Sequence, residues 1–248
     1  MKLYLGCSQW GYAAWIGTLY PSRAEPKDFL YHYSRIFNCV ELNPTFYQEI
    51  GKKTIRNWKT KVGPDFRFCP KFPRTISHDG LLRNVEEQTS LFLDDVKGFE
   101  NNLGVCFIQL PRFYPKRYVS AIEEYFKSMP ESFKISLELR VDWLEDQKLL
   151  GIALAMLRER KIGIVIVDSV ETRQYLNRIK MTNSTGFIRF ISYGHPTDYE
   201  RIDDWVLQIK KWQLRGLDEC YFFLHFPSEE GDETEIVEYA IEKFKKFD

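Results

Sequence analysis

The sequence of 248 residues lacks the features that would assign it at once to a membrane or nucleic-acid-binding class. No apolar run approaches the ~18 residues of a membrane-spanning helix, and we expect the N-terminal apolar stretch to be too short for a signal peptide. Lysine plus arginine and aspartate plus glutamate both number 35, so the formal net charge is zero. We therefore expect no membrane association and no strongly basic face for duplex nucleic acid.

Cysteine is scarce, and none of the cysteines forms a C-x-x-C pair. An odd count of 5 in a chain of this length predicts reduced thiols and a cytoplasmic location. Each cysteine lies within or beside an apolar run, which favours a small core residue over a nucleophile. The cysteines are Cys7, Cys39, Cys69, Cys106 and Cys220.

Motifs for common cofactors are missing as well. The first apolar run continues as "GCSQWGYAAWIG" (6–17) rather than G-x-G-x-x-G, and there is no P-loop. H-E-x-x-H and paired histidine and cysteine ligands are also absent, which argues against zinc. Glu41, Glu138 and Asp168 could offer oxygen ligands to magnesium or manganese, but no motif marks such a site. The cofactor stays unknown at this level.

Eight short apolar runs, rich in Val, Ile, Phe and Tyr, are present and predict strands. They cover residues 2–7, 39–43, 66–71, 105–110, 134–139, 162–168, 186–192 and 220–225. Segments with apolar residues at helical spacing lie between them. These segments cover 25–37, 52–62, 84–102, 115–129, 146–161, 199–215 and 232–247, and the weakest helical pattern is at 169–179.

Strands that alternate with helices predict parallel βα units. Eight units in a chain of this length favour a TIM-type (β/α)8 barrel over an open doubly wound sheet. The sequence has no internal repeat, low-complexity tract or linker, so we predict one α/β domain over residues 1–248.

Polar residues follow the ends of the predicted strands, where TIM barrels carry their active sites. Side chains alternate along a strand, so Glu41 shares a face with Asn43, and Glu138 shares one with Arg140. The candidate catalytic residues are Glu41, Glu138, His78 in the polar loop 74–80, and His225 at the end of the last strand. The candidate substrate-binding residues are Trp10, Asn43, Tyr47, Lys71, Gln109, Arg140, Trp143, Asp168 and Arg189.

Two interpretations of this charged rim stay open. Unpaired buried charges cost several kcal/mol each, so these groups must pair with one another or bind a ligand. Internal ion pairs, such as Glu138 with Arg189 or Lys71, would satisfy them without any function. A cluster of ionisable groups at the functional end of a barrel favours a site instead. The aromatic residues of the same loops either cover the loops or stack on a sugar ring or base.

Five segments resemble, in order, motifs of the YecE-like family, catalogued as domain-of-unknown-function family seventy-two. They are "GCSQWGYAAWIGTLYP", "FNCVELNPTFYQ", "FRFCPKFPRTISH", "CFIQLPRFY" and "LELRVDWL". The resemblance covers nearly the whole chain and implies a TIM-barrel-like fold with no settled biochemical activity. The matching polar positions are Trp10, Glu41, Asn43, Thr45, Tyr47, Lys71, His78, Gln109, Glu138, Arg140, Trp143 and Arg189.

The chain departs from the family pattern in ways that suggest a divergent member. Arg112 stands where the family often has a second proline after Q-L-P. The R-x-H-G of the seventh strand reads "RFIS", so Ile191 and Ser192 replace the histidine and glycine. The asparagine pair after the eighth strand is replaced by "LHFPSE", which places His225 there. A mechanism that needs the seventh-strand histidine would require His225 to substitute for it.

Three function classes follow from these residues. The first is an enzyme for an anionic, ring-containing substrate, such as a phosphosugar, nucleotide or nucleic-acid end, with Lys71, Arg140 and Arg189 holding the anion. A phosphoesterase-like or nuclease-like hydrolase would use Glu138 or Glu41 as general base, with a pKa raised by burial, and a histidine as acid. The second is a glycoside hydrolase with paired carboxylates. The third is a non-catalytic binding module for nucleic acid or a metabolite. A Schiff base at Lys71 is a further, minor option. The oligomeric state is not predicted.

Overall fold

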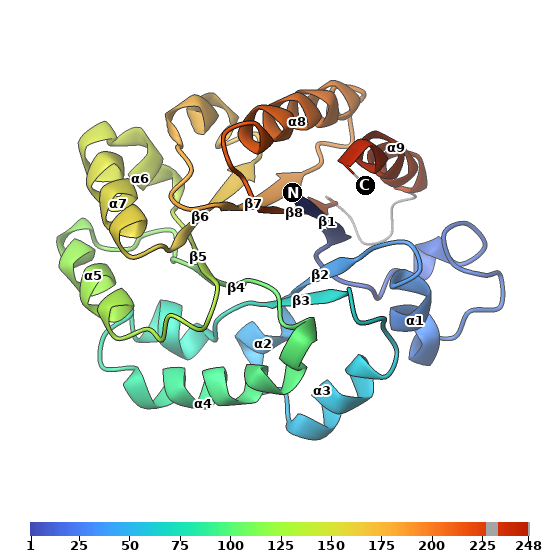
Figure 1. The fold of residues 1–248 in the computed structure, drawn as a ribbon, viewed down its shortest axis with the longest axis horizontal. Helices are drawn as coiled ribbons and strands as arrows, with labels where there is room; N and C mark the ends of the chain where they lie inside the picture. Colours follow the sequence, from blue (N-terminus) through green and yellow to red (C-terminus); the bar gives the residue numbers. More distant parts are fainter. Residues whose placement is uncertain (227–232, 248) are drawn as a thin grey trace.

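The protein folds as a parallel β-barrel surrounded by helices (Figure 1), as the computed structural model shows for residues 1–226 and 233–247. The strands are β1 (Lys2–Cys7), β2 (Cys39–Leu42), β3 (Arg67–Pro70), β4 (Cys106–Gln109), β5 (Ile135–Glu138), β6 (Gly163–Asp168), β7 (Thr185–Ile191) and β8 (Glu219–His225). Their order in the sheet is β3-β2-β1-β8-β7-β6-β5-β4. The predicted TIM-type barrel is confirmed.

Helices follow most strands, as the apolar spacing predicts. The α-helices are α1 (Phe29–Tyr33), α2 (Pro44–Tyr47), α3 (Lys52–Lys59), α4 (Glu86–Val96), α5 (Val119–Lys127), α6 (Val141–Glu145), α7 (Gln147–Glu159), α8 (Thr197–Gln213) and α9 (Thr234–Phe244). The short helices α2 and α6 are too brief to show a sequence period and were not predicted. Across residues 1–226 and 233–247, every helix is too short or too polar to cross a bilayer.

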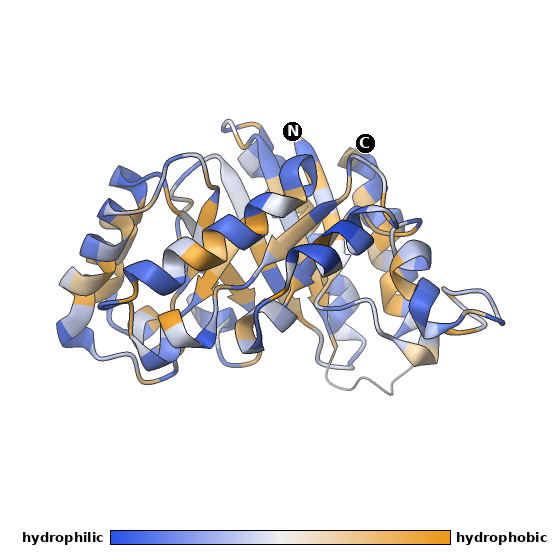
Figure 2. Ribbon diagram, turned by 90° about the horizontal axis from the view of Figure 1, so that it is seen from below, coloured by the Kyte–Doolittle hydropathy of each residue, from blue (hydrophilic) through white to orange (hydrophobic). Residues whose placement is uncertain are grey.

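The barrel has two apolar layers because side chains alternate along each strand. One layer fills the interior and includes Tyr4, Phe107, Phe187, Tyr221 and Phe223. The other layer lies between the strands and the helices, and Figure 2 shows apolar strands inside a shell of helices with hydrophilic stretches. The aromatic interior forms an apolar floor beneath the carboxyl ends of the strands.

The ring of strands closes at a narrow seam between β3 and β4. Only two isolated bridges join these strands, Phe68 with Leu103 and Lys71 with Phe107, in the part of the chain that the structure describes. Gly104 lies at this seam and donates its N–H to the Phe68 carbonyl at 2.8 Å. A Cβ at Gly104 would lie 2.7 Å from Cys69 Sγ, so the close approach of the strands needs glycine here.

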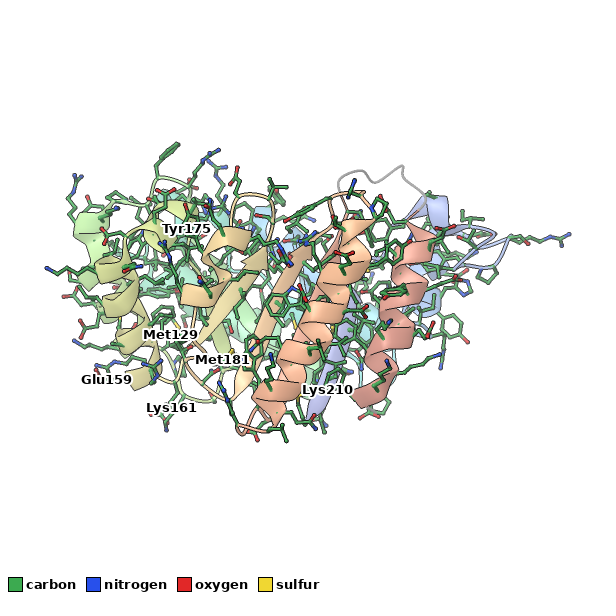
Figure 3. The ribbon with its side chains drawn as sticks, turned by 90° about the horizontal axis from the view of Figure 1, so that it is seen from above. Met129, Glu159, Lys161, Tyr175, Met181 and Lys210 are labelled. Atoms are coloured by element: carbon green, nitrogen blue, oxygen red, sulfur yellow. The ribbon has the colours of Figure 1, made fainter. Side chains whose placement is uncertain are left out.

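The connection from β6 to β7 differs from its neighbours. Residues 169–179, which carry the weakest helical pattern, form only a short 3-10 helix, η6 (Arg173–Arg178). Figure 3 places Tyr175 of this segment and Lys161, just before β6, toward opposite ends of the barrel. A surface cavity of about 970 Å³ lies between η6 and α8 and is lined by Trp205 and Trp212. It opens on the outer wall, away from the interior of the barrel.

Candidate functional site

Six strands bring polar side chains to one layer above the aromatic floor. Residues two places apart on a strand share a face. Cys39, Phe187 and Phe223 face the interior, so the residues two places after them also face the interior. The residues of this layer are Glu41, Lys71, Gln109, Glu138, Arg189 and His225. We call them, together with Arg140, the rim cluster.

Arg189 joins two buried carboxylates across the barrel. Its Nε and Nη2 donate to Glu41 Oε2 and Oε1 at 2.9 and 3.0 Å, and its Nη1 donates to Glu138 Oε2 at 2.6 Å. Its guanidinium carbon lies 5.7 Å from the Phe107 ring of the floor. Strands β2, β5 and β7 are thereby tied together, although none of them is a neighbour of another in the sheet.

The remaining lone pairs of Glu41 are also used. Asn43 Nδ2 donates to Oε1 at 2.9 Å, and His225 Nε2 lies 3.0 Å from Oε2. Because an ionised carboxylate only accepts, this geometry requires the His225 proton on Nε2. Each oxygen of Glu41 therefore accepts two hydrogen bonds, and the carboxylate has no free face for a substrate.

Glu138 begins a second chain of contacts that runs toward solvent. Its Oε1 accepts from Gln109 Nε2 at 2.6 Å and from Arg140 Nη1 at 3.0 Å. The amide oxygen of Gln109 in turn accepts from Lys71 Nζ at 2.7 Å. The Arg140 side chain keeps 30% of its surface exposed. Of the cations in the rim cluster, Arg140 is therefore the one that a ligand reaches most easily.

The electrostatics of the two glutamates differ from the sequence-based expectation of a raised pKa. Burial raises the pKa of Glu41, but Arg189 and His225 outweigh it and hold that pKa well below its usual range. Burial likewise raises the pKa of Glu138, and Arg189 and Arg140 lower it further than burial raises it. Both carboxylates are therefore ionised at neutral pH, and the expectation of a raised glutamate pKa was wrong.

Lys71 and His78 have the opposite environment. Burial and the nearby Arg189 charge lower the pKa of Lys71 to about 8. Burial also lowers the pKa of His78, with Lys71 and Arg74 as further causes. The two groups share the ring of Phe46, which lies 4.2 Å from Lys71 Nζ and 5.0 Å from the His78 ring. His78 lies in one wide helical turn (Thr75–Asp79), not in an open loop.

Phe46 was not among the predicted site residues, although it stands within "VELNPTFYQ". It is buried on α2, which begins directly after β2 with Pro44 in its first turn. Thr45 of the same turn donates to the carbonyls of Leu42 and Lys71 at 2.8 and 2.7 Å. The turn thus fixes both Phe46 and the backbone of Lys71.

Asp168 does not join the rim cluster. Val167 packs on the interior layer, so the next residue of β6 points outward, toward the helices. Asp168 Oδ2 accepts from Trp205 Nε1 at 2.8 Å and from Arg173 Nη1 at 3.0 Å, while Oδ1 lies 3.0 Å from Arg201 Nη2. Its predicted substrate-binding role is corrected to a contact that holds α8 and η6.

The predicted aromatic residues also separate. Trp143 is completely buried and packs 5.9 Å from Tyr114, so it offers no surface to a ligand. Trp10 packs edge-on against Trp58 of α3 at 5.2 Å. Tyr47 is 79% exposed and contacts Phe46 at 4.9 Å, so of these three aromatic residues it has the largest surface open to a ligand.

No group of three or more histidine, cysteine or acidic side chains suited to a metal ion occurs among residues 1–226 and 233–247. The oxygens of Glu41 and Glu138 are occupied by guanidinium and amide donors instead. All five cysteines are buried free thiols, and burial raises the pKa of each, as in Cys106.

Comparison with known proteins agrees with this architecture. Residues 4–246 match the family model described as a protein of unknown function, DUF72. The chain belongs to the DUF72 family. It is 28% identical over 247 residues to the UPF0759 protein YecE of Escherichia coli K12, which covers 91% of this chain and 86% of that protein.

Solved structures of DUF72 members share the fold. A crystal structure of a DUF72 family protein from Thermotoga maritima has a TM-score of 0.73 at 21% identity, over 100% of this chain and 99% of the other. A DUF72 family protein from Enterococcus faecalis has a TM-score of 0.74 at 18% identity, over 98% and 95%. These similarities support the barrel fold and say nothing about an activity.

Proposed function

We propose that this DUF72 member is an enzyme that binds an anionic, phosphate-bearing, ring-containing substrate at the rim cluster and acts as a phosphoesterase-like hydrolase. One observation carries the proposal: three cations, Arg189, Arg140 and Lys71, stand against two ionised carboxylates in the cluster. The excess positive charge lies at Lys71 and Arg140, on the side that reaches solvent. Both have N–H donors beyond those used internally, and a phosphate oxygen would satisfy them.

The residues take different roles in this proposal. Lys71 and Arg140 hold the anion, and Tyr47 offers an exposed ring against which a sugar or base stacks. His78 has a lowered pKa, so it is neutral at pH 7 and can accept a proton from an attacking water. His225, oriented by Glu41, is the candidate acid. Arg189, Glu41 and Glu138 position these groups rather than touch the substrate.

A glycoside hydrolase fits the cluster less well. That chemistry needs one carboxylic acid with a raised pKa beside an ionised carboxylate. The pKa values of Glu41 and Glu138 are both lowered, and neither carboxyl is available as a proton donor at neutral pH. A non-catalytic binding module remains the alternative that the experiment must separate.

We propose a cytoplasmic location, for the reason that the cysteine content already suggests. The five cysteines are buried free thiols, and unpaired thiols are typical of a reducing compartment. The ligand is a small molecule or a nucleic-acid end, because the balanced charge offers no broad basic face.

The first test is a thermal-shift screen of the wild-type protein against phosphate, nucleotides, sugar phosphates, short oligonucleotides and neutral sugars. A ligand at ~100 times its dissociation constant stabilises the protein by about 2.7 kcal/mol, which is readable as a shift. We expect anion-selective shifts that Arg140→Gln removes. Arg35→Gln is the matched control, since Arg35 follows α1, is exposed, and places its guanidinium 4.6 Å from the Tyr31 ring.

Turnover is tested in the same screen by phosphate release. We expect His78→Gln to keep the anion shift and to lower the rate at least ~100-fold, as loss of a general base does. An anion shift without any turnover would support a binding module instead. Shifts with neutral sugars alone, or anion shifts that Arg140→Gln leaves unchanged, would overturn the proposal.

A further inference from the structure

Lys71 is a buried lysine without an acidic partner. It is 8% exposed, and no carboxylate lies within ion-pair distance of its nitrogen among the residues that the structure describes. The other two cations of the rim cluster, Arg140 and Arg189, each bind a carboxylate. Lysine is almost never buried unless it is paired, so this position calls for an explanation.

The partner that Lys71 does have is neutral and fixed in orientation. Gln109 donates through Nε2 to Glu138 at 2.6 Å, which turns its amide oxygen toward Lys71 Nζ at 2.7 Å. An amide oxygen accepts from either an ammonium or a neutral amine, whereas a carboxylate would hold the ammonium form far more strongly. Gln109 therefore positions the nitrogen without fixing its charge.

The surroundings of Lys71 disfavour the ammonium form. Burial is the largest cause of its lowered pKa, about 8, and the Arg189 and Arg140 charges lower that pKa further. The Glu138 and Glu41 charges raise the pKa, and the Phe46 ring at 4.2 Å favours the ammonium form, but burial and the two arginines outweigh these groups. At pH 7 a group with this pKa holds roughly two hundred times more neutral amine than an exposed lysine near 10.4. A desolvated lysine beside another cation is the arrangement that activates amines as nucleophiles.

We propose that Lys71 is a nucleophilic amine that condenses with the aldehyde or ketone of an anionic substrate. This inference rests on the proposed anion site and narrows its substrate to phosphate-bearing compounds that also carry a carbonyl group, such as open-chain sugar phosphates. For this substrate class Arg140, which meets Glu138 beside Gln109, would hold the phosphate without Lys71, and the neutral amine form of Lys71 would meet the carbonyl carbon instead of the anion.

The step balances without any further reactant. The Nζ lone pair attacks the carbonyl carbon, a C–N bond forms, and the carbonyl oxygen takes up the proton that the nitrogen loses. The hydroxyl then leaves with a second proton as water while the nitrogen forms a C=N bond. His78 shares the Phe46 ring with Lys71 and is the nearby group suited to carry these protons.

The test is reductive trapping with D-glyceraldehyde 3-phosphate and sodium cyanoborohydride at pH 7, followed by peptide mass mapping. We expect an adduct at Lys71 that forms at least ~10 times faster than at exposed lysines, given the larger share of neutral amine. The rate should level off above pH 8, while rates at exposed lysines continue to rise. Lys71→Arg should remove the adduct, and Lys127→Arg, on the outer face of α5, should leave it.

Neutral glyceraldehyde separates this inference from the proposed anion site. Preference for the phosphorylated probe, lost in Arg140→Gln, supports both. Trapping of both probes at equal rates keeps the reactive amine and overturns the anion site. An anion-selective thermal shift with no selective adduct at Lys71 keeps the anion site and overturns the nucleophile. A control with unfolded protein must show Lys71 reacting like other lysines.

Discussion

Arg189 donates three hydrogen bonds to two carboxylates that are both almost completely buried. Its own guanidinium is buried as well, and the two carboxylates raise its pKa above the ordinary arginine value despite that burial. A buried triad of this kind adds little net stability over apolar residues, but removal of one member exposes the others to an uncompensated cost. Substitution of Arg189 is therefore a test of stability rather than of ligand binding.

We expect Arg189→Met to lower the free energy of unfolding by about 3–5 kcal/mol, because Glu41 and Glu138 then lose their shared counter-charge. Urea denaturation measures the change. The triple variant with Glu41→Gln and Glu138→Gln should recover part of the loss, since it buries no unpaired charge. A loss below ~1 kcal/mol in the single variant would show that the carboxylates do not depend on Arg189.

One residue of β6, Asp168, contacts both the helix α8 and the short η6. Asp168 is completely buried and contacts Arg173 of η6 together with Arg201 and Trp205 of α8. Arg201 also pairs with Asp198 at 2.6 Å. The carboxylate therefore links β6, η6 and α8 in addition to their apolar packing.

Asp168→Ala is expected to cost about 3–5 kcal/mol, because it leaves Arg201 buried with half of its counter-charge. Urea denaturation gives the value, and the anion-dependent thermal shift at the rim cluster should stay as in the wild type. Asp204→Ala is the matched control: it removes the exposed partner of Arg173 and should cost no more than ~1 kcal/mol. Loss of anion binding in folded Asp168→Ala would return this residue to the site.

Closure of the barrel is a property of the whole molecule, and it depends on the seam between β3 and β4. The strands approach closely at Gly104, and the bridge between Lys71 and Phe107 sits on the same seam. Lys71 is therefore positioned by the part of the sheet with the fewest strand-to-strand hydrogen bonds. A larger side chain at the seam should therefore lower the stability of the protein and also displace Lys71.

We expect Gly104→Ala to destabilise the protein by about 1–3 kcal/mol, since the added methyl group would press on Cys69 Sγ and the Phe68 carbonyl. Gly151→Ala is the control, because nothing lies within 4 Å of its Cβ position in α7 and alanine favours a helix by up to ~1 kcal/mol. The melting temperatures of the two variants should therefore shift in opposite directions, with Gly104→Ala lower and Gly151→Ala higher than the wild type. Equal shifts would show that the seam tolerates a side chain.

Alternation along the strands was enough to predict most of the rim cluster from the sequence. Glu41, Arg189 and His225 each sit two residues beyond an interior apolar residue, so their shared face could be read from the chain. Asp168 shows the limit of the argument, because its position at a strand end suggested the site while its parity places it outside. Counting from Val165 would have found the correct face.

The ion pairs between side chains of different strands could not be predicted from alternation. The sequence left internal ion pairs and a functional site open as alternatives, and the structure contains the pairs of Arg189 with Glu41 and Glu138. Whether a carboxylate is raised or lowered in pKa depends on which cation stands 3 Å away, and that distance is set by strands far apart in the chain. The lack of a partner at Lys71 is visible only in three dimensions.

The triad of Glu41, Arg189 and Glu138 also limits how such a chain can change over generations. Replacement of Arg189 alone passes through a form with two buried carboxylates that lack their shared cation, and that form is less stable than either end point. We therefore expect a change at Arg189 to be accompanied by changes at Glu41 and Glu138. Lys71 has an uncharged amide as its partner, so its replacement leaves no carboxylate without a counter-charge. This position can therefore vary unless the chemistry of Lys71 is needed.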